Sequence, residues 1–211
     1  MKSLAILGSS GHGRVVAETA ELCGWETIVF FDDAYPAIRQ NLCWSVLGTL
    51  DDLIQRMNEF HGVFVAIGHN ATRLEKLRRL ISAGANLVTL IHPFACVSRY
   101  AQIGEGSAVL PGAIINANAR VGAGVILNTQ SSVDHDCRLG DGVHISPGAR
   151  LGGNVEIGDR SWVGIGASIR HGIRIGADAV VGAGAAVTRD VPDHVTAVGV
   201  PARVRPSGGS H

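Results

Sequence analysis

Residues 121–159 read VGAGVILNTQSSVDHDCRLGDGVHISPGARLGGNVEIGD, and within them an aliphatic residue recurs at every sixth position. The same spacing continues in both directions, from residue 91 to residue 187, without an insertion. The residue two places before each aliphatic position is usually small, and a glycine often follows it. The recurring aliphatic residues are Ile91, Val97, Ile103, Val109, Ile115, Val121, Leu127, Val133, Leu139, Ile145, Leu151, Ile157, Val163, Ile169, Ile175, Val181 and Val187.

A period of six fits neither a helix of 3.6 residues per turn nor an alternating strand that ends in a hairpin. It fits a short strand plus a turn, repeated, with the aliphatic side chain pointing inward, which is a parallel β-helix. Three such units make one triangular coil of 18 residues, so residues 18 apart stack in columns about 4.8 Å apart. The periodicity alone leaves the hand of the coil open.

Within this repeat, residues 131–153 hold two histidines and three aspartates, and three of these five residues stand together in SSVDHDC. The 18-residue column puts His135 between Ala117 and Gly153, two small neighbours that leave space around the imidazole. Asp136 follows directly, and a second histidine, His144, lies half a coil away. We therefore expect His135 to lie in a notch with a carboxylate beside it. The alternative is a solvated histidine on a turn.

The first 88 residues show a different pattern, in which apolar strands alternate with amphipathic helices. This alternation predicts a small Rossmann-like parallel α/β domain at residues 1–88, followed by the β-helix at 89–205 and a disordered tail at 206–211. The fold class is therefore α/β plus β. The expected strands span residues 2–7, 26–33 and 62–68, and the expected helices span 11–24, 51–60 and 71–84.

The glycine turn GSSGHG at residues 8–13 joins the first expected strand to the first expected helix. Unpaired N–H groups and the helix dipole favour an anion at such a turn, although its glycine spacing is not that of the dinucleotide motif GxGxxG. Asp32, Asp33 and Gly68 follow the other strands at the same edge of the sheet, where a nucleotide-bearing ligand would fit. The alternative is a glycine turn that only permits tight packing.

Charge and composition exclude several classes of function. Lys plus Arg equals Asp plus Glu at 18 each, so no bulk charge attracts nucleic acid. No stretch is apolar for long enough to cross a membrane, and the cytoplasm is the expected location. The four cysteines lack CxxC spacing, which argues against zinc or a disulfide framework and favours small buried hydrophobes.

The whole pattern resembles the bacterial sugar acyltransferase family. The motifs that carry the resemblance are GSSGHG, FFDD, AIGHN, LIHP, the hexapeptide array with SSVDHDCRLGDGVHISPGA, and the closing VGVPA. This family includes sialic acid O-acetyltransferases and nucleotide-amino-sugar N-acetyltransferases of the UDP-N-acetylbacillosamine type. The resemblance implies a left-handed β-helix, a homotrimer with active sites between subunits, acetyl-coenzyme A as cosubstrate, and no metal.

The resemblance also implies roles for individual residues. His135 corresponds to the general base and Asp136 to its partner acid, a position where many relatives have the longer Glu. The positions expected to contact acetyl-coenzyme A are His144, Gly153, Ile165 and Ala183. The positions expected to bind the nucleotide sugar are Ser10, Gly11, His12, Asp32, Asp33 and Gly68.

We therefore expect an N-acetyltransferase that acts on the amino group of a UDP-, dTDP- or GDP-linked amino-deoxy sugar, in the biosynthesis of bacterial surface glycans or glycoprotein sugars. An amine must lose a proton as it attacks a thioester, and a histidine with a pKa near neutrality suits that task. One alternative is sugar O-acetylation of the sialic acid type. Others are a zinc enzyme of the carbonic-anhydrase kind and a non-enzymatic β-helix scaffold.

Overall fold

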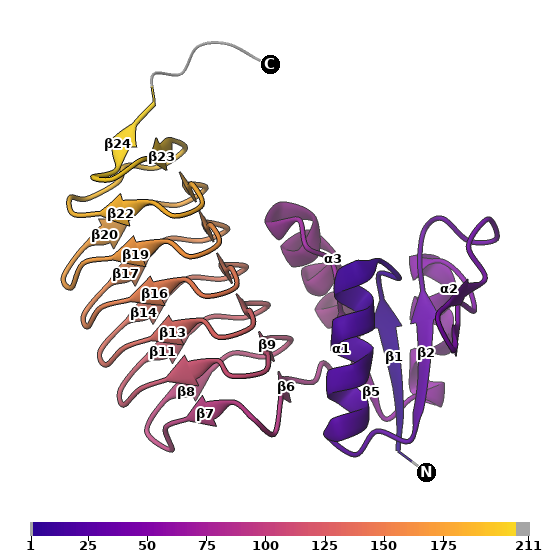
Figure 1. Cartoon of the computed structure of the whole chain (residues 1–211). Coiled ribbons are helices and arrows are strands. Elements are labelled where there is room, and N and C mark those ends of the chain that lie inside the picture. Colours follow the sequence, from indigo (N-terminus) through magenta and orange to yellow (C-terminus); the bar gives the residue numbers. More distant parts are fainter. Residues whose placement is uncertain (1, 206–211) are drawn as a thin grey trace.

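The computed structural model describes residues 2–205, so the tail expected at residues 206–211 lies outside the described residues. An N-terminal unit of sheet and helices lies beside a tall triangular coil of short strands (Figure 1). The expected fold class is confirmed, and the coil is a left-handed parallel β-helix. No helix among the described residues combines the length and apolar character needed to span a bilayer.

The N-terminal unit is a three-stranded parallel sheet of order β2-β1-β5, with helices on both faces. Alternating side chains of the central strand serve the two faces: Leu4 and Ile6 pack with the first helix, and Ala5 and Leu7 with the other two. The elements are β1 (Ser3–Leu7), α1 (Gly11–Leu22), β2 (Thr27–Phe31), α2 (Leu50–Arg56), the 3-10 helix η1 (Met57–Glu59), β5 (Gly62–Val65) and α3 (Asn70–Ser82). All three expected strands and all three expected helices are present.

A small antiparallel hairpin was not expected from the sequence. It consists of β3 (Gln40–Asn41) and β4 (Trp44–Ser45), which are too short to show an alternating pattern. Asn41 donates from Nδ2 to the carbonyl oxygens of Ser9 and Ser10 and accepts from Arg14. The hairpin therefore secures the glycine turn after β1.

The coil stacks two-residue strands at a spacing of 18 residues, as the periodicity predicts. The strands form three flat faces, each named here for one outward residue. The His144 face contains β6 (Leu90–Ile91), β9 (Ala108–Val109), β12 (Ile126–Leu127), β15 (His144–Ile145), β18 (Trp162–Val163), β21 (Val180–Val181), β23 (Thr196–Val198) and β24 (Arg203–Val204). The Ser132 face contains β7 (Cys96–Val97), β10 (Ile114–Ile115), β13 (Ser132–Val133), β16 (Arg150–Leu151), β19 (Ser168–Ile169) and β22 (Ala186–Val187). The Arg138 face contains β8 (Gln102–Ile103), β11 (Arg120–Val121), β14 (Arg138–Leu139), β17 (Glu156–Ile157) and β20 (Arg174–Ile175).

The predicted aliphatic positions fill the interior of the coil from Val109 to Val187, where each is buried. In the first rung, Val97 and Ile103 are half-buried, and Ile91 is 41% exposed although it pairs in register with Val109. It belongs to the first rung, and no further rung covers it. At the other end, the antiparallel pair β23 and β24 closes the coil.

Three corners join the faces, and each is a column of turn residues. The His135 corner contains Ala117, His135, Gly153 and His171. The Ile165 corner contains Pro147, Ile165 and Ala183. The Gly142 corner contains Gly106, Gly124, Gly142, Arg160, Asp178 and His194. The His135 corner joins the Ser132 face to the Arg138 face, because His135 lies between β13 and β14. It therefore lies opposite the third face, the His144 face.

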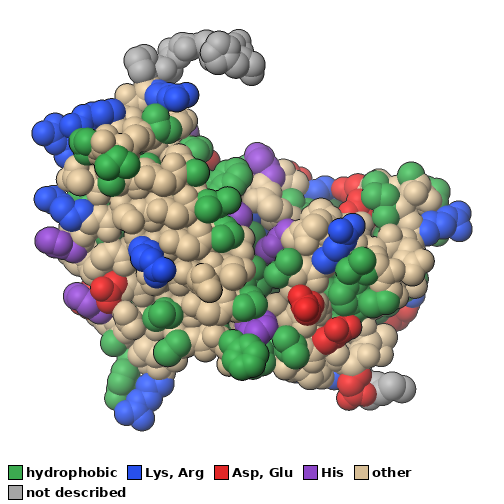
Figure 2. Space-filling model, viewed as in Figure 1, with side chains coloured by type: hydrophobic (Ala, Val, Ile, Leu, Met, Phe, Trp, Pro, Cys, Tyr) green, Lys and Arg blue, Asp and Glu red, His purple; other side chains and the backbone are tan. Residues whose placement is uncertain are grey.

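The N-terminal unit packs on the His144 face and the Gly142 corner. Leu90, Ala108 and Leu110 share a hydrophobic core with α1 and the sheet. On α3, Leu77 lies over the Gly142 corner, since a Cβ added at Gly124 would lie 3.4 Å from its Cδ1. In Figure 2, hydrophobic and histidine side chains gather along this seam between the two units. The His135 corner is thus left on the far side of the coil.

The cysteines depart from the expectation of four buried hydrophobes. Only Cys137 is buried, Cys43 and Cys96 are exposed, and all four are free thiols. Cys96 occupies the outward position of β7, and Cys43 lies in the hairpin turn between β3 and β4. The expectation failed because residue type does not report on which side of a two-residue strand a side chain points.

We expect Leu151→Ala to lower the free energy of unfolding by about 2–5 kcal/mol, because Leu151 is 3% exposed in the coil interior. Its neighbour Arg150 points outward from the same strand, so Arg150→Ala should change stability by less than about 0.5 kcal/mol. Urea unfolding followed by circular dichroism measures both. Equal losses would contradict the inward and outward assignment.

Candidate active site

His135 and Asp136 form an ion-pair geometry on the turn between β13 and β14. Nδ1 of His135 lies 2.7 Å from Oδ2 of Asp136. Asp136 adopts a left-handed conformation with φ of 61°, and Asn118 donates to its other oxygen at 2.6 Å. The shorter acid therefore reaches the imidazole, and Nε2 remains the free nitrogen.

Gly153 supplies the space for the His135 ring. A Cβ atom at Gly153 would lie 2.5 Å from Nε2 of His135, closer than side-chain atoms approach. The N–H of Asn154 donates to the His135 carbonyl at 2.9 Å, which fixes the stacking of the two rungs. Within the described residues, the Gly153 N–H donates to no backbone carbonyl. His135 therefore lies beside Gly153, as the 18-residue spacing predicts.

Two carboxylates favour the protonated form of His135. The hydrogen bond to Asp136 and then the charge of Asp134 raise the pKa of His135 above its ordinary value. Asp134 also accepts from the His135 N–H at 2.8 Å, which holds the turn. The side chain of His135 is 60% exposed, so an external molecule can reach Nε2. This arrangement suits a proton acceptor near neutral pH.

His144 lies in a different environment on the opposite side of the coil. Its ring stacks on Trp162 with centroids 5.5 Å apart and planes 3° apart. Nε2 lies 3.2 Å from Nδ2 of Asn128, while Nδ1 is buried without a partner among the described residues. Burial, followed by the charges of Arg73 and His12, lowers the pKa of His144 to about 3. His144 is therefore neutral at physiological pH.

Exposed apolar side chains border His144 along the Ile165 corner. Ile165 is 61% exposed, Trp162 46% and Val180 38%. Ala183, which is also exposed, stacks one rung above Ile165, since Gly184 donates to the Ile165 carbonyl at 2.8 Å. The structure thus brings His144, Ile165 and Ala183 to one surface, away from His135 and Gly153. Trp162 belongs to this surface, and sequence reasoning gave it no role.

A pocket of about 250 Å³ opens at the carboxyl edge of the N-terminal sheet. It brings together four of the expected residues: Ser10, Asp32, Asp33 and Gly68. Gly68 faces open space, since an added Cβ would meet nothing within 4 Å. Gly11 and His12 do not line this pocket.

The two acids in the pocket differ in their partners. Asp32 accepts from Ser9 N–H at 2.7 Å and Ser9 Oγ at 2.9 Å, so one of its oxygens secures the glycine turn. Asp33 accepts from Leu50 N–H at 3.2 Å and lies 3.2 Å from Nζ of Lys76. Burial opposes ionisation of Asp33, but these contacts lower its pKa overall.

Lys76 is a residue of the pocket that sequence reasoning missed. Its side chain is 18% exposed and comes from α3, about 43 positions after Asp33 in the chain. A lysine beside the N-terminus of α1 can bind a phosphate as a point charge. The only sequence signal was its position one helical turn after Thr72, which also lines the pocket.

His12 does not line the pocket, and it lies close enough to Arg73 and His144, at the seam between the two units, for their charges to interact. Its Nε2 is buried without a partner among the described residues. Burial and then the charge of Arg73 lower its pKa to about 4. Gly8 and Gly13 explain the turn itself, because Gly8 has φ of 105° and a Cβ at Gly13 would clash with the Gly8 carbonyl.

Two further observations concern possible binding sites outside these two regions. A larger open groove, about 640 Å³, follows the Arg138 face between Arg138, Glu156 and Arg174, and neither His135 nor the residues of the N-terminal pocket line it. Across residues 2–205, no three His, Cys, Asp or Glu side chains converge in a way that could hold a metal ion.

Two protein families match parts of the chain. Residues 3–80 match the PglD N-terminal domain, and residues 154–189 match the bacterial transferase hexapeptide (six repeats). A curated relative, UDP-N-acetylbacillosamine N-acetyltransferase of Bacillus subtilis (strain 168), is 40% identical over 113 residues. That match spans 52% of this chain and 52% of the relative, about half the length of each.

Solved structures match nearly the whole chain. The acetyltransferase domain of PglB from Neisseria gonorrhoeae FA1090, in complex with acetyl coenzyme A, has a TM-score of 0.93 and 41% identity over 97% of this chain and 99% of that chain. PerB from Caulobacter crescentus, in complex with CoA and GDP-perosamine, has a TM-score of 0.92 and 40% identity over 98% of both chains. A histidine-to-alanine mutant of GDP-perosamine N-acetyl transferase from the same organism, bound to the same two molecules, has a TM-score of 0.94 and 40% identity over 98% of both chains.

His12, His135 and His144 should titrate at different pH values, and NMR of their Cε1–H groups measures this directly. We expect the pKa of His135 to lie above the ordinary value of a histidine, and His12 and His144 to stay neutral down to about pH 4 and about pH 3. Asp136→Asn should lower the His135 midpoint, because the carboxylate favours the protonated ring. A midpoint that is unchanged in Asp136→Asn would contradict the pairing.

Proposed function

The chain belongs to the family of bacterial sugar acetyltransferases in which a PglD-type N-terminal domain precedes a hexapeptide coil, and we propose that it acetylates the amino group of a nucleotide-linked amino-deoxy sugar. Acetyl-coenzyme A is the proposed acetyl donor. The observation that carries this proposal is the His135–Asp136 pair, whose free Nε2 lies in a solvent-accessible notch beside Gly153 of the next rung. The N-terminal pocket supports a nucleotide-linked acceptor over a free sugar acid.

The N-terminal pocket has the chemistry to hold a nucleoside diphosphate. Lys76 supplies a cation, and α1 begins at the pocket with a cap residue, Ser10, whose side chain makes no capping hydrogen bond. The N–H groups of the first turn therefore have no side-chain acceptor at Ser10, and an anion would satisfy them. Asp33 offers a carboxylate to ribose or base. UDP, dTDP and GDP are the proposed carriers.

The proposed chemistry uses His135 as the general base. The acceptor nitrogen attacks the acetyl carbonyl carbon, and Nε2 of His135 takes its proton as the C–N bond forms. Asp136 then stabilises the imidazolium through the hydrogen bond to Nδ1. The C–S bond breaks, and the proton on His135 is available to the departing thiolate. The Gly153 N–H is proposed to face the carbonyl oxygen while negative charge develops there.

The coenzyme supplies an acetyl group that is already activated as a thioester. The residues available to hold its arm are the exposed apolar side chains of Trp162, Ile165 and Val180, with Ala183 beside them. Such a strip of apolar surface is unusual on a solvated coil and fits an aliphatic ligand. His144 is neutral, and its Nδ1 has no partner within the described part of the chain, so it would offer a hydrogen bond at the edge of this strip.

A single chain cannot assemble this site. His135 occupies the corner opposite the His144 face, whereas the N-terminal pocket and the apolar strip lie on the His144 side. A second copy would have to present its His135 corner to that side. We therefore propose a homotrimer in which each site lies between two coils, since a three-fold ring repeats one such contact and closes it.

The proposed setting is the biosynthesis of bacterial surface glycans or glycoprotein sugars in the cytoplasm. The four free cysteines suit a reducing compartment.

The proposal is tested by release of the coenzyme A thiol in the presence of acetyl-coenzyme A and a panel of acceptors. We expect turnover with at least one UDP-, dTDP- or GDP-linked amino sugar, and thermal stabilisation of the protein by the same compound. Free sialic acid should give no turnover. Turnover with sialic acid alone would identify an O-acetyltransferase instead.

His135→Ala should lower kcat on that acceptor by about 10²- to 10⁴-fold, which is the usual contribution of a positioned base. His171→Ala is the matched control, because His171 is an exposed histidine one rung above Gly153 in the same corner. It should retain the kcat of the unsubstituted enzyme. Similar kcat values for the two variants would rule out the proposed base.

A further inference from the structure

Arg73 is a buried cation that has no carboxylate partner among residues 2–205. It is 1% exposed and lies on α3, in the seam between the N-terminal unit and the coil. A buried charge is costly unless hydrogen bonds satisfy it, so a guanidinium at this place needs an explanation. Desolvation lowers its pKa to about 10, which leaves it protonated at neutral pH.

All five N–H donors of Arg73 are used, and they bond to three separate parts of the chain. Nη1 donates to the carbonyl oxygens of Ile67 and Gly68, at 2.9 and 3.0 Å, in the loop that lines the N-terminal pocket. Nε donates to Gly124 O at 2.7 Å, and Nη2 donates to Gly142 O at 2.8 Å. The last donor meets Oδ1 of Asn70 at 2.9 Å.

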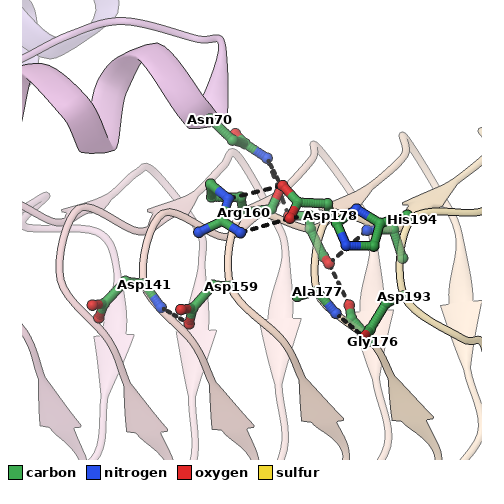
Figure 3. Close-up of polar contacts among 11 residues, drawn as sticks. Asn70, Asp141, Asp159, Arg160, Gly176, Ala177, Asp178, Asp193 and His194 are labelled. Carbon is green, nitrogen blue, oxygen red and sulfur yellow. Dashed lines mark hydrogen bonds and ion pairs between the residues drawn. The ribbon is translucent and has the colours of Figure 1, made fainter.

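The carbonyl oxygens of the coil that accept hydrogen bonds from α3 lie in successive rungs of the Gly142 corner. Gly124 and Gly142 accept from Arg73, and the carbonyl of Arg160 in the next rung accepts from Nδ2 of Asn70 at 2.8 Å. Figure 3 shows Asn70 reaching from α3 to the coil at Arg160. The N-terminal turn of α3 is therefore fixed against three consecutive rungs.

The Gly142 corner carries glycines where α3 packs against it. Gly124 and Gly142 have φ of 62° and 66°, and both are buried under α3. A Cβ at Gly142 would lie 3.4 Å from Cβ of Leu74, so the column leaves little spare room under the helix. Beyond the helix the column carries side chains, and Arg160 pairs with Asp178 at 2.6 Å (Figure 3).

We propose that Arg73 is a positioning residue that holds the pocket loop at Gly68 in a fixed place relative to the coil, and thereby places the acceptor amine at the proposed reaction centre. This inference rests on the proposed function. Gly142 lies two residues before His144, so one guanidinium ties the loop of the N-terminal pocket to the strand that borders the apolar strip. A shift of about 1 Å at such a link can cost about 10²-fold in rate.

Arg73→Lys tests the proposal, because lysine keeps the charge but has at most three donors for five acceptors. We expect kcat for the nucleotide-linked amino sugar to fall about 10- to 100-fold, and KM for acetyl-coenzyme A to stay within about twofold. The slow acetylation of hydroxylamine, a small amine that does not need the N-terminal pocket, should be unchanged. A fall in kcat with the nucleotide-linked acceptor alone cannot result from general destabilisation, which would lower the rate with both acceptors.

Arg78→Lys is the control, since Arg78 is exposed on the same helix, and its kinetics should equal those of the unsubstituted enzyme. If Arg73→Lys does not unfold cooperatively, Asn70→Ala is the variant that tests the proposal. We then expect kcat for the nucleotide-linked amino sugar to fall about 3- to 10-fold, with hydroxylamine acetylation unchanged. Equal losses for both acceptors, or no loss, would overturn the positioning role. An unsubstituted enzyme that acetylates hydroxylamine but no nucleotide-linked amino sugar would instead refute the proposed acceptor.

Discussion

The backbone hydrogen bonds between successive rungs, whose paired residues are 18 apart, are the constraint on which the rest of the coil depends. Each rung donates to the next, so a side chain at a corner is fixed between its neighbours 18 residues before and after it. Val133 and Leu151 fill the interior because the register leaves them no other side to face. The same register puts His135 beside Gly153.

One backbone geometry serves two purposes at two corners. At the Gly142 corner, left-handed glycines leave room for a helix, and their own carbonyls accept from Arg73, while the carbonyl of Arg160 in the next rung accepts from Asn70. At the His135 corner, the same left-handed region is occupied by Asp136, whose carboxylate turns back to the preceding imidazole. Aspartate and asparagine tolerate this conformation better than most residues do, which is compatible with the acid standing directly after the histidine.

Three histidines differ in charge because their surroundings differ. His135 is exposed beside two carboxylates, and its pKa is raised. His12 and His144 are buried near the Arg73 cation, and their pKa values are lowered to about 4 and about 3. Only the first is suited to exchange a proton near neutral pH. The other two are suited to hydrogen bonding without charge, and they lie on the side of the coil where the proposed acceptor and coenzyme would bind.

The sequence by itself determined the coil, its register, the notch at His135, and the alternation of strands and helices before it, because these depend on patterns that are local or strictly periodic. It also placed Ser10, Asp32, Asp33 and Gly68 at one edge of a sheet. The tertiary structure decided that Asp136 reaches His135, that Lys76 joins Asp33, that His12 faces the seam, and that Arg73 ties the pocket loop to the coil. The first of these depends on one backbone dihedral angle. The others depend on how α3 packs against the sheet and the coil, which brings together residues up to 91 positions apart that share no periodic pattern.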